Sequence, residues 1–154
     1  MRSLRPLYLA GIGLALLLFL AVSALLARAF SANGAEQSAI TTLAQAEARG
    51  DVEAMLRQIQ GCRTSSPCRQ RVSENAASLR RPGTVSILQL QTSTDFSLTS
   101  TLGTARVAWR VDGSLPIVQC VRVRRAGDAI SGLRVELLEI SPRLKSDAVC
   151  ARRF

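Results

Sequence analysis

The sequence contains no histidine. This absence removes the side chain that most often serves as a general base near neutral pH, together with Ser-His and Cys-His catalytic pairs and histidine-based metal sites. The sequence also lacks a G-x-S-x-G turn, a glycine-rich phosphate loop ending in Lys-Ser or Lys-Thr, and an aspartate-rich calcium loop. We therefore expect a protein that is not an enzyme, with no catalytic residue, no cofactor and no bound metal.

Charge is missing from one long stretch of the chain. Leu7 to Ala27 is an uncharged run of 21 residues, and a helix of this length spans ~31 Å, which matches a hydrocarbon core of ~30 Å. Arg2 and Arg5 precede the run, and a lone Arg28 follows it. The positive-inside rule then predicts that residues 1–30 are a cytoplasmic N-terminus and a transmembrane signal-anchor. The chain is expected to be a single-pass protein of the cell membrane with an extracytoplasmic C-terminal domain.

A cleaved signal peptide is the alternative to a retained anchor, because Ala27-Arg28-Ala29 has the small-x-small form of a signal-peptidase site. Two features favour retention. The apolar run is longer than the usual ~7–15 residues of a signal-peptide core, and Arg28 lies inside the cleavage motif. Both alternatives export the domain that follows.

All four cysteines, Cys62, Cys68, Cys120 and Cys150, follow the apolar run. An even number of cysteines in an exported domain indicates disulfides, although their connectivity is not fixed by the sequence. We favour Cys62 with Cys68, which closes a short loop, and Cys120 with Cys150, which ties the C-terminal tail to a strand. A zinc site is the competing interpretation, and it lacks both C-x₂-C spacing and histidine.

Domain boundaries follow from composition. Residues 31–35 are small and polar and include Asn33-Gly34, a turn signal, so we predict a short linker there. Residues 36–154 are then one extracytoplasmic domain, because this length is too short for two domains that each bury a core.

Helical periodicity follows the predicted linker. Apolar residues recur at spacings of three and four from Glu36 to Ile59, and Gly50 breaks the pattern, which predicts two helices or one kinked helix. Asp51 is placed to cap the second segment. A third helix is expected at about Cys68–Arg80, with Pro82-Gly83 as its stop signal.

Beyond Gly83 the apolar period changes to two, which indicates half-buried strands. The expected strands contain Val85 and Ile87, Phe96 to Ser100, Ala105 to Val111, Ile117 to Arg125, and Leu133 to Ile140. Trp109 falls in the apolar phase and is expected in the core or in a pocket wall. Helices followed by a strand meander define an α+β domain, in which helices pack on a curved antiparallel sheet.

The segment from Ala44 to Leu56, AQAEARGDVEAML, resembles the opening helix pair of the nuclear transport factor 2-like (cystatin-like cone) superfamily. In that family an alanine-rich helix runs into Gly-Asp, here Gly50-Asp51, and a second helix. The order of elements over residues 36–141 is similar too. The resemblance implies a cone-shaped domain with five or six strands, of the membrane-anchored bacterial envelope type, and an envelope protein as partner. No catalytic residue is carried over.

The chain is basic, with a formal net charge of +9. Arginines that fall in the polar phase of the expected strands could form a basic sheet face that binds anionic lipid or an anionic polymer. These candidate residues are Arg106, Arg110, Arg122, Arg124 and Arg134. The alternative is a solvated face on which Asp112, Glu136 and Glu139 pair with the arginines. Nucleic acid is not expected as a partner, because aromatic stacking platforms are not evident.

Three functional classes remain. We favour a non-catalytic, membrane-anchored binding or assembly module of the cell envelope. A small-ligand carrier that uses a cone cavity is the second hypothesis, and a pocket enzyme is the third. A perturbed acid inside a ligand-sized pocket would favour the enzyme.

Overall fold

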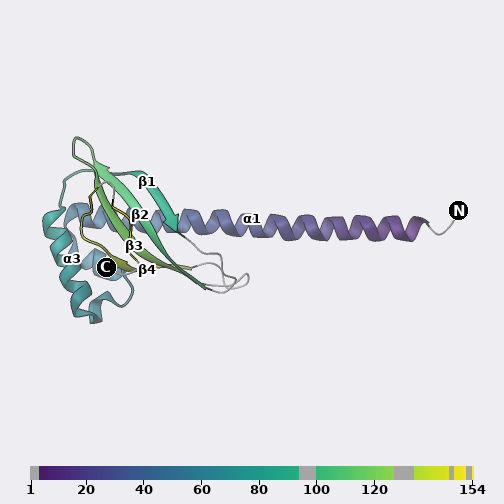
Figure 1. Ribbon diagram of the computed structural model, residues 1–154, viewed down its shortest axis with the longest axis horizontal. Helices are drawn as coiled ribbons and strands as arrows, with labels where there is room; N and C mark the ends of the chain where they lie inside the picture. Colours follow the sequence, from purple (N-terminus) through teal and green to yellow (C-terminus); the bar gives the residue numbers. More distant parts are fainter. Residues whose placement is uncertain (1–3, 94–99, 127–133, 146–147, 152–153) are drawn as a thin grey trace.

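The computed structural model describes residues 4–93, 100–126, 134–145, 148–151 and 154 (Figure 1). Its elements in chain order are α1 Leu4–Arg49, α2 Val52–Gln58, the 3₁₀ helix η1 Cys62–Thr64, α3 Ser66–Ser78, β1 Val85–Ser93, β2 Ser100–Val111, β3 Ile117–Ala126 and β4 Arg134–Ile140. The predicted α+β class, with an N-terminal apolar helix and an antiparallel sheet, is confirmed.

Helix α1 is a single α-helix of 46 residues. Its segment Tyr8–Leu26 is long and apolar enough to cross a membrane, with a mean hydropathy of 2.6, and it makes no buried contact with the rest of the chain. Figure 1 shows this half projecting away from the domain. The other half packs on the sheet through buried residues such as Ile40 and Leu43. One helix therefore contains both the apolar segment and part of the domain core.

The turn expected at Asn33-Gly34 is not formed, because α1 continues through residues 31–35. An interior Gly costs a helix only ~1 kcal/mol relative to Ala, and Asn costs less. Helical sequence on both sides of these residues outweighs this cost, since helix formation is cooperative. The connection between the apolar segment and the domain is therefore helical.

Helix α1 ends at the predicted break. Gly50 has φ 72°, a left-handed conformation that favours glycine, and Asp51 then caps α2 by accepting a hydrogen bond from the Ala54 N–H at 2.9 Å. The two-helix form of the prediction is thus confirmed. Helix α3 begins two residues earlier than expected, with Pro67 in its first turn, and it ends at Ser78.

Within the described residues, the sheet is an antiparallel meander of four strands in the order β1-β2-β3-β4, and it is not closed. A β-bulge at Leu88 interrupts the β1–β2 register, and one at Leu138 interrupts the β3–β4 register. The expected strand residues Phe96 and Leu98 and the hairpin signal Gly127-Asp128 lie outside the described residues. The superfamily resemblance stays a prediction.

Helices cover one face of the sheet, and a C-terminal segment covers part of the other. Trp109 is completely buried on the helix side. On the opposite face, the Arg106 Nε donates to the Ala148 carbonyl at 3.2 Å, and Cys120 is bonded to Cys150. The second disulfide joins Cys62 to Cys68, so the favoured pairing is the one observed. All four sulfur atoms are in disulfides and are not zinc thiolates.

The two edge strands of the sheet differ in how far other parts of the chain cover them. The β4 edge is partly covered, because the Gln60 N–H donates to the Leu137 carbonyl at 2.7 Å. Strand β1 forms the other edge, and its sequence, VSILQLQTS, contains no charged residue and no proline. The Gln45 side chain on α1 bonds both Gly83 O and Val85 N at the start of β1. From there, β1 runs back along α1 toward the anchor (Figure 1).

Candidate functional site

The five candidate arginines lie on the outer face of the sheet, away from the helices. In the β2–β3 register, Arg106 pairs with Cys120, which precedes Arg122 by two residues. In the β3–β4 register, Arg134 pairs with Ala126, which follows Arg124 by two residues. Because side chains alternate along a strand, these positions share one face. Arg110 lies four residues after Arg106 on β2 and belongs to the same face.

Two of these arginines form ion pairs with carboxylates of the neighbouring strand. Arg122 lies 3.2 Å from Glu139, and Arg124 lies 2.5 Å from Glu136. Arg124 also donates to the Gln60 side chain at 2.6 Å. Two of the three carboxylates named in the alternative prediction, Glu136 and Glu139, therefore pair with arginines of β3. This part of the face is nearly neutral as a result.

The other three arginines differ in exposure. Arg106 is half-buried, and its Nε donates to the Ala148 carbonyl at 3.2 Å. Arg110 and Arg134 are exposed, and neither belongs to an ion pair among the described residues, nor does Asp112. The binding of an anion by this face stays a prediction.

A buried polar cluster between α1, α3 and the sheet was not predicted. Gln119 on β3 is its centre. The Gln119 Oε1 accepts from Trp109 Nε1 at 2.8 Å, and its Nε2 donates to Glu47 Oε1 at 2.8 Å and to Ser141 O at 3.3 Å. Asn75 on α3 also donates to Ser141 O, at 3.0 Å. The cluster joins α1, α3, the sheet and the start of the C-terminal segment.

Glu47 is the titratable group of this cluster. Burial raises the pKa of Glu47 to about 7, and hydrogen bonds from Gln119 and Asn75 act in the opposite direction. Its second oxygen, Oε2, has no hydrogen-bond partner among the described residues. A carboxyl group near its pKa at neutral pH is suited to proton transfer. Such a role requires substrate access, and packed side chains of the core surround Glu47.

A second unpredicted polar contact joins α1 to β3. Arg125 donates through both Nε and Nη2 to Glu36 Oε2, with the Nε contact at 2.7 Å. Glu36 is 1% exposed, and the Arg125 side chain is 12% exposed. This ion pair lies where α1 enters the domain, at the end of the sheet nearer the anchor.

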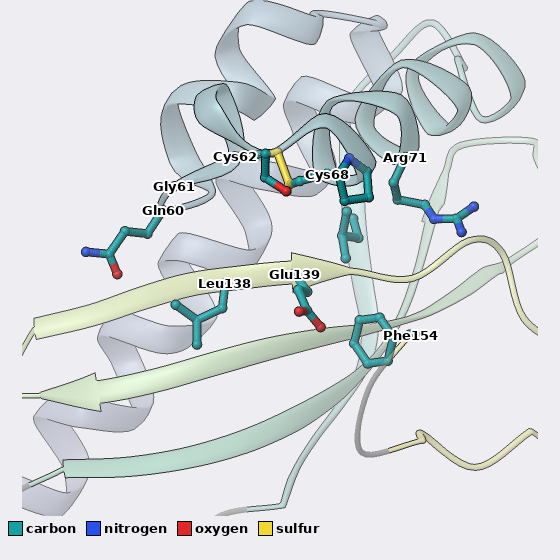
Figure 2. Close-up of a pocket in the computed structure, with 11 residues that line it drawn as sticks. Gln60, Gly61, Cys62, Cys68, Arg71, Leu138, Glu139 and Phe154 are labelled. Carbon is teal, nitrogen blue, oxygen red and sulfur yellow. A yellow bond between two sulfur atoms is a disulfide. The ribbon is translucent and has the colours of Figure 1, made fainter.

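A surface groove of about 410 Å³ lies between the Cys62–Cys68 disulfide and β4. Figure 2 shows Leu138 and Glu139 on the β4 side and the ring of Phe154 at one end. Arg71 contributes from α3, so the lining mixes apolar and charged groups. A second groove of about 310 Å³ lies beside the end of α2. Neither groove is lined by Glu47, so the perturbed acid and these hollows do not form one site.

No protein-family model matches the chain, and neither the curated proteins nor the solved structures contain a match. Function must therefore be argued from the residues.

The sequence did contain a signal for the buried cluster. Glu47 follows Ile40 and Leu43 at helical spacings of seven and four, so it lies in the apolar phase of α1. Gln119 likewise occupies the core-facing phase of β3, between Ile117 and Val121. Polar residues in two apolar phases, together with one tryptophan, indicate a buried hydrogen-bonded group.

Proposed function

We propose that this protein is a non-catalytic binding or assembly module of the cell envelope, held outside the cytoplasm by a retained, single-pass N-terminal anchor. The continuity of α1 from Leu4 to Arg49 carries the proposal. Membership of the nuclear transport factor 2-like superfamily, as a membrane-anchored envelope type, is part of it. The α1–Gly50-Asp51–α2 junction and the order of elements support that membership.

Retention of the anchor is supported by the local structure of the cleavage motif. Ala27-Arg28-Ala29 lies within α1, whereas proteolytic sites are usually exposed and non-helical. The same helix supplies Ile40, Leu43 and Glu47 to the domain core. The anchor and the domain are therefore parts of one structural unit.

Export is supported by the two disulfides, Cys62–Cys68 and Cys120–Cys150. Disulfides persist in oxidising compartments and are rare in the cytosol. This agrees with the orientation that the positive-inside rule gives from Arg2 and Arg5.

A binding role, rather than catalysis, is supported by the placement of the polar groups. Glu47 is enclosed by the core, and the grooves are lined by other residues. The charged groups that reach the surface are mainly arginines, which suit recognition of anionic partners.

A protease-accessibility experiment tests this proposal. The full chain carries an N-terminal and a C-terminal epitope and is examined in intact cells and in cells with a permeabilised outer layer. We expect a membrane-bound protein of full length whose C-terminal epitope is digested while the N-terminal epitope is protected. A domain that stays protected until the cell membrane itself is dissolved would overturn export. A soluble form beginning near Phe30 would overturn the anchor.

A further inference from the structure

Charge is unevenly distributed along the molecule. At the end of the sheet nearer the apolar segment, Arg125 pairs with Glu36 and Arg124 with Glu136, and Arg134 is exposed and belongs to no ion pair among the described residues. The end farther from the anchor carries a group of arginines that we name the distal arginines. This group consists of Arg49, Arg80, Arg81 and Arg110.

Backbone contacts place the distal arginines at one end of the domain. Arg49 is the last residue of α1, and the Arg81 N–H donates to the Ala48 carbonyl at 2.8 Å. Arg80 packs against Gly50. Arg110 is the penultimate residue of β2 at this end, and it lies on the outer face of the sheet, whereas the other three arginines come from the helical layer.

Val111, the last residue of β2 and the neighbour of Arg110, lies against the segment that follows α3. Gly83 lies two residues after Arg81, and a Cβ on Gly83 would lie 2.5 Å from Val111 Cγ1. The chain that leaves α3 therefore passes directly against the end of β2.

The distal arginines present unmatched positive charge. Arg49, Arg80 and Arg110 are exposed, and Arg81 is half-buried. The five ion pairs among the described residues include none of the four. Arg49 interacts favourably with the partial negative charge at the C-terminus of α1. This interaction explains the position of Arg49 but not of the other three arginines.

The helix itself sets the distance of this charge from the membrane. Arg49 follows Leu26, the last residue of the apolar segment, by 23 residues of one continuous helix. At ~1.5 Å per residue this is ~35 Å, several times the Debye length of ~8 Å at physiological ionic strength. Headgroups of the protein's own membrane are therefore screened from the distal arginines, and the matching anion must lie farther out.

The side chains define the chemistry of that anion. Lys145 is the only lysine in the sequence, so the basic residues are almost all guanidinium groups, which bind carboxylates and phosphates in a bidentate geometry. Trp109 is completely buried and offers no stacking surface for nucleotide bases.

We propose that the distal arginines dock an acidic segment of a partner polypeptide that lies beyond the membrane surface. This inference rests on the proposed function, because it assumes a retained anchor with the domain outside the cytoplasm. The guanidinium groups bind side-chain carboxylates of the segment, and α1 holds them at a fixed height above the bilayer.

The test uses the full chain reconstituted in vesicles of neutral phosphatidylcholine, with fluorescent poly-L-glutamate as the probe. Arg80→Gln/Arg110→Gln removes two distal charges and leaves Arg49 at the helix end intact. Arg57→Gln/Arg134→Gln is the matched control, because both residues are exposed and belong to none of the ion pairs among the described residues. We expect about tenfold weaker binding by the distal variant at low salt, a shallower salt dependence, and less than a twofold change in the control.

Equal weakening by the two variants would overturn the proposal, because the probe would then report net charge alone. Absence of poly-L-glutamate binding by the unmodified protein would overturn it too. Tighter binding to single-stranded DNA, or to vesicles containing phosphatidylglycerol, would assign the arginines to another class of partner. The test uses purified protein, so it can fail while the topology experiment succeeds, and the reverse also holds.

Discussion

Glu36 on α1 and Arg125 on β3 form a buried ion pair at the point where α1 joins the domain. The two residues are far apart in the sequence, and their contact fixes the helix against the end of the sheet nearer the apolar segment. Glu36 Oε1 has no hydrogen-bond partner among the described residues, so the arginine supplies most of the compensation for burying this carboxylate. Removal of the arginine leaves an uncompensated buried charge.

Arg125→Ala is therefore expected to destabilise the domain by about 3 kcal/mol, the lower end of the cost of breaking a buried pair. The double variant Glu36→Leu/Arg125→Met should recover most of this loss, since it removes both charges and keeps the volume. Urea unfolding followed by the fluorescence of Trp109, the only tryptophan, measures both. A double variant no more stable than Arg125→Ala would contradict this account of the pair.

Glu47 predicts a pH dependence of stability. Its pKa is raised from 4.5 to about 7 in the folded protein, so folding favours the protonated form. The stabilisation is fully present below pH 4.5 and is lost as pH rises through 7, a change of about 3 kcal/mol by linkage. Glu47→Gln keeps an acceptor for Gln119 and does not ionise. This variant should match the unmodified protein at low pH and exceed its stability above pH 7.

The measured quantity is the difference in unfolding free energy between variant and unmodified protein across pH, which cancels the titration of other carboxylates. Glu53→Gln, at an exposed position of α2, is the control and should give a small, pH-independent difference. If the difference in unfolding free energy for Glu47→Gln is also independent of pH, folding does not raise the pKa of Glu47, and the prediction is wrong.

Gln119 is expected to be the most sensitive member of the buried cluster. Gln119→Leu removes the partner of Trp109 Nε1 and of Glu47 Oε1 at once, and each unsatisfied buried group costs ~1–3 kcal/mol. We expect a loss of about 3 kcal/mol and a shifted Trp109 emission spectrum. Gln91→Leu, on the exposed face of β1, is the matched control and should change stability by less than ~0.5 kcal/mol.

The Cys120–Cys150 disulfide closes a loop with a sequence separation of 30, against 6 for Cys62–Cys68. Chain-entropy arguments give ~3–4 kcal/mol for the longer loop and ~2 kcal/mol for the shorter. Replacing Cys120 and Cys150 by serine should therefore lower the urea midpoint more than the same change at Cys62 and Cys68. Peptide mapping without reductant provides the control for connectivity, and an opposite order of the two midpoints would contradict the loop-length argument.

Much of the fold was predictable because local signals agreed with the tertiary structure. The Gly50 break, the cap at Asp51 and the alternation around Trp109 each follow from the short-range preferences of the chain. The turn expected at Asn33-Gly34 failed for the opposite reason, since a small local preference was outweighed by helix on both sides.

The charged contacts were less predictable than the elements. Alternation placed Arg122 and Arg124 on the outer face correctly, whereas their partners Glu139 and Glu136 depended on the β3–β4 register. That register includes a bulge at Leu138, which periodicity does not reveal. The distal arginines come from three separate chain segments, and only the packing of α3 against α1 brings Arg80 and Arg81 to the end of the anchor helix.

The direction of β1 relative to α1 restricts how two copies of the chain can pair through their β1 edges. An uncharged edge strand without proline is prone to pair with the same strand of another copy. Antiparallel pairing across a two-fold axis would point the two anchor helices in opposite directions, because β1 runs along α1, and two copies inserted in one bilayer cannot adopt that arrangement. In the proposed membrane-anchored state, antiparallel edge-to-edge pairing of neighbouring copies is therefore excluded, and a domain severed from its anchor would lose that protection.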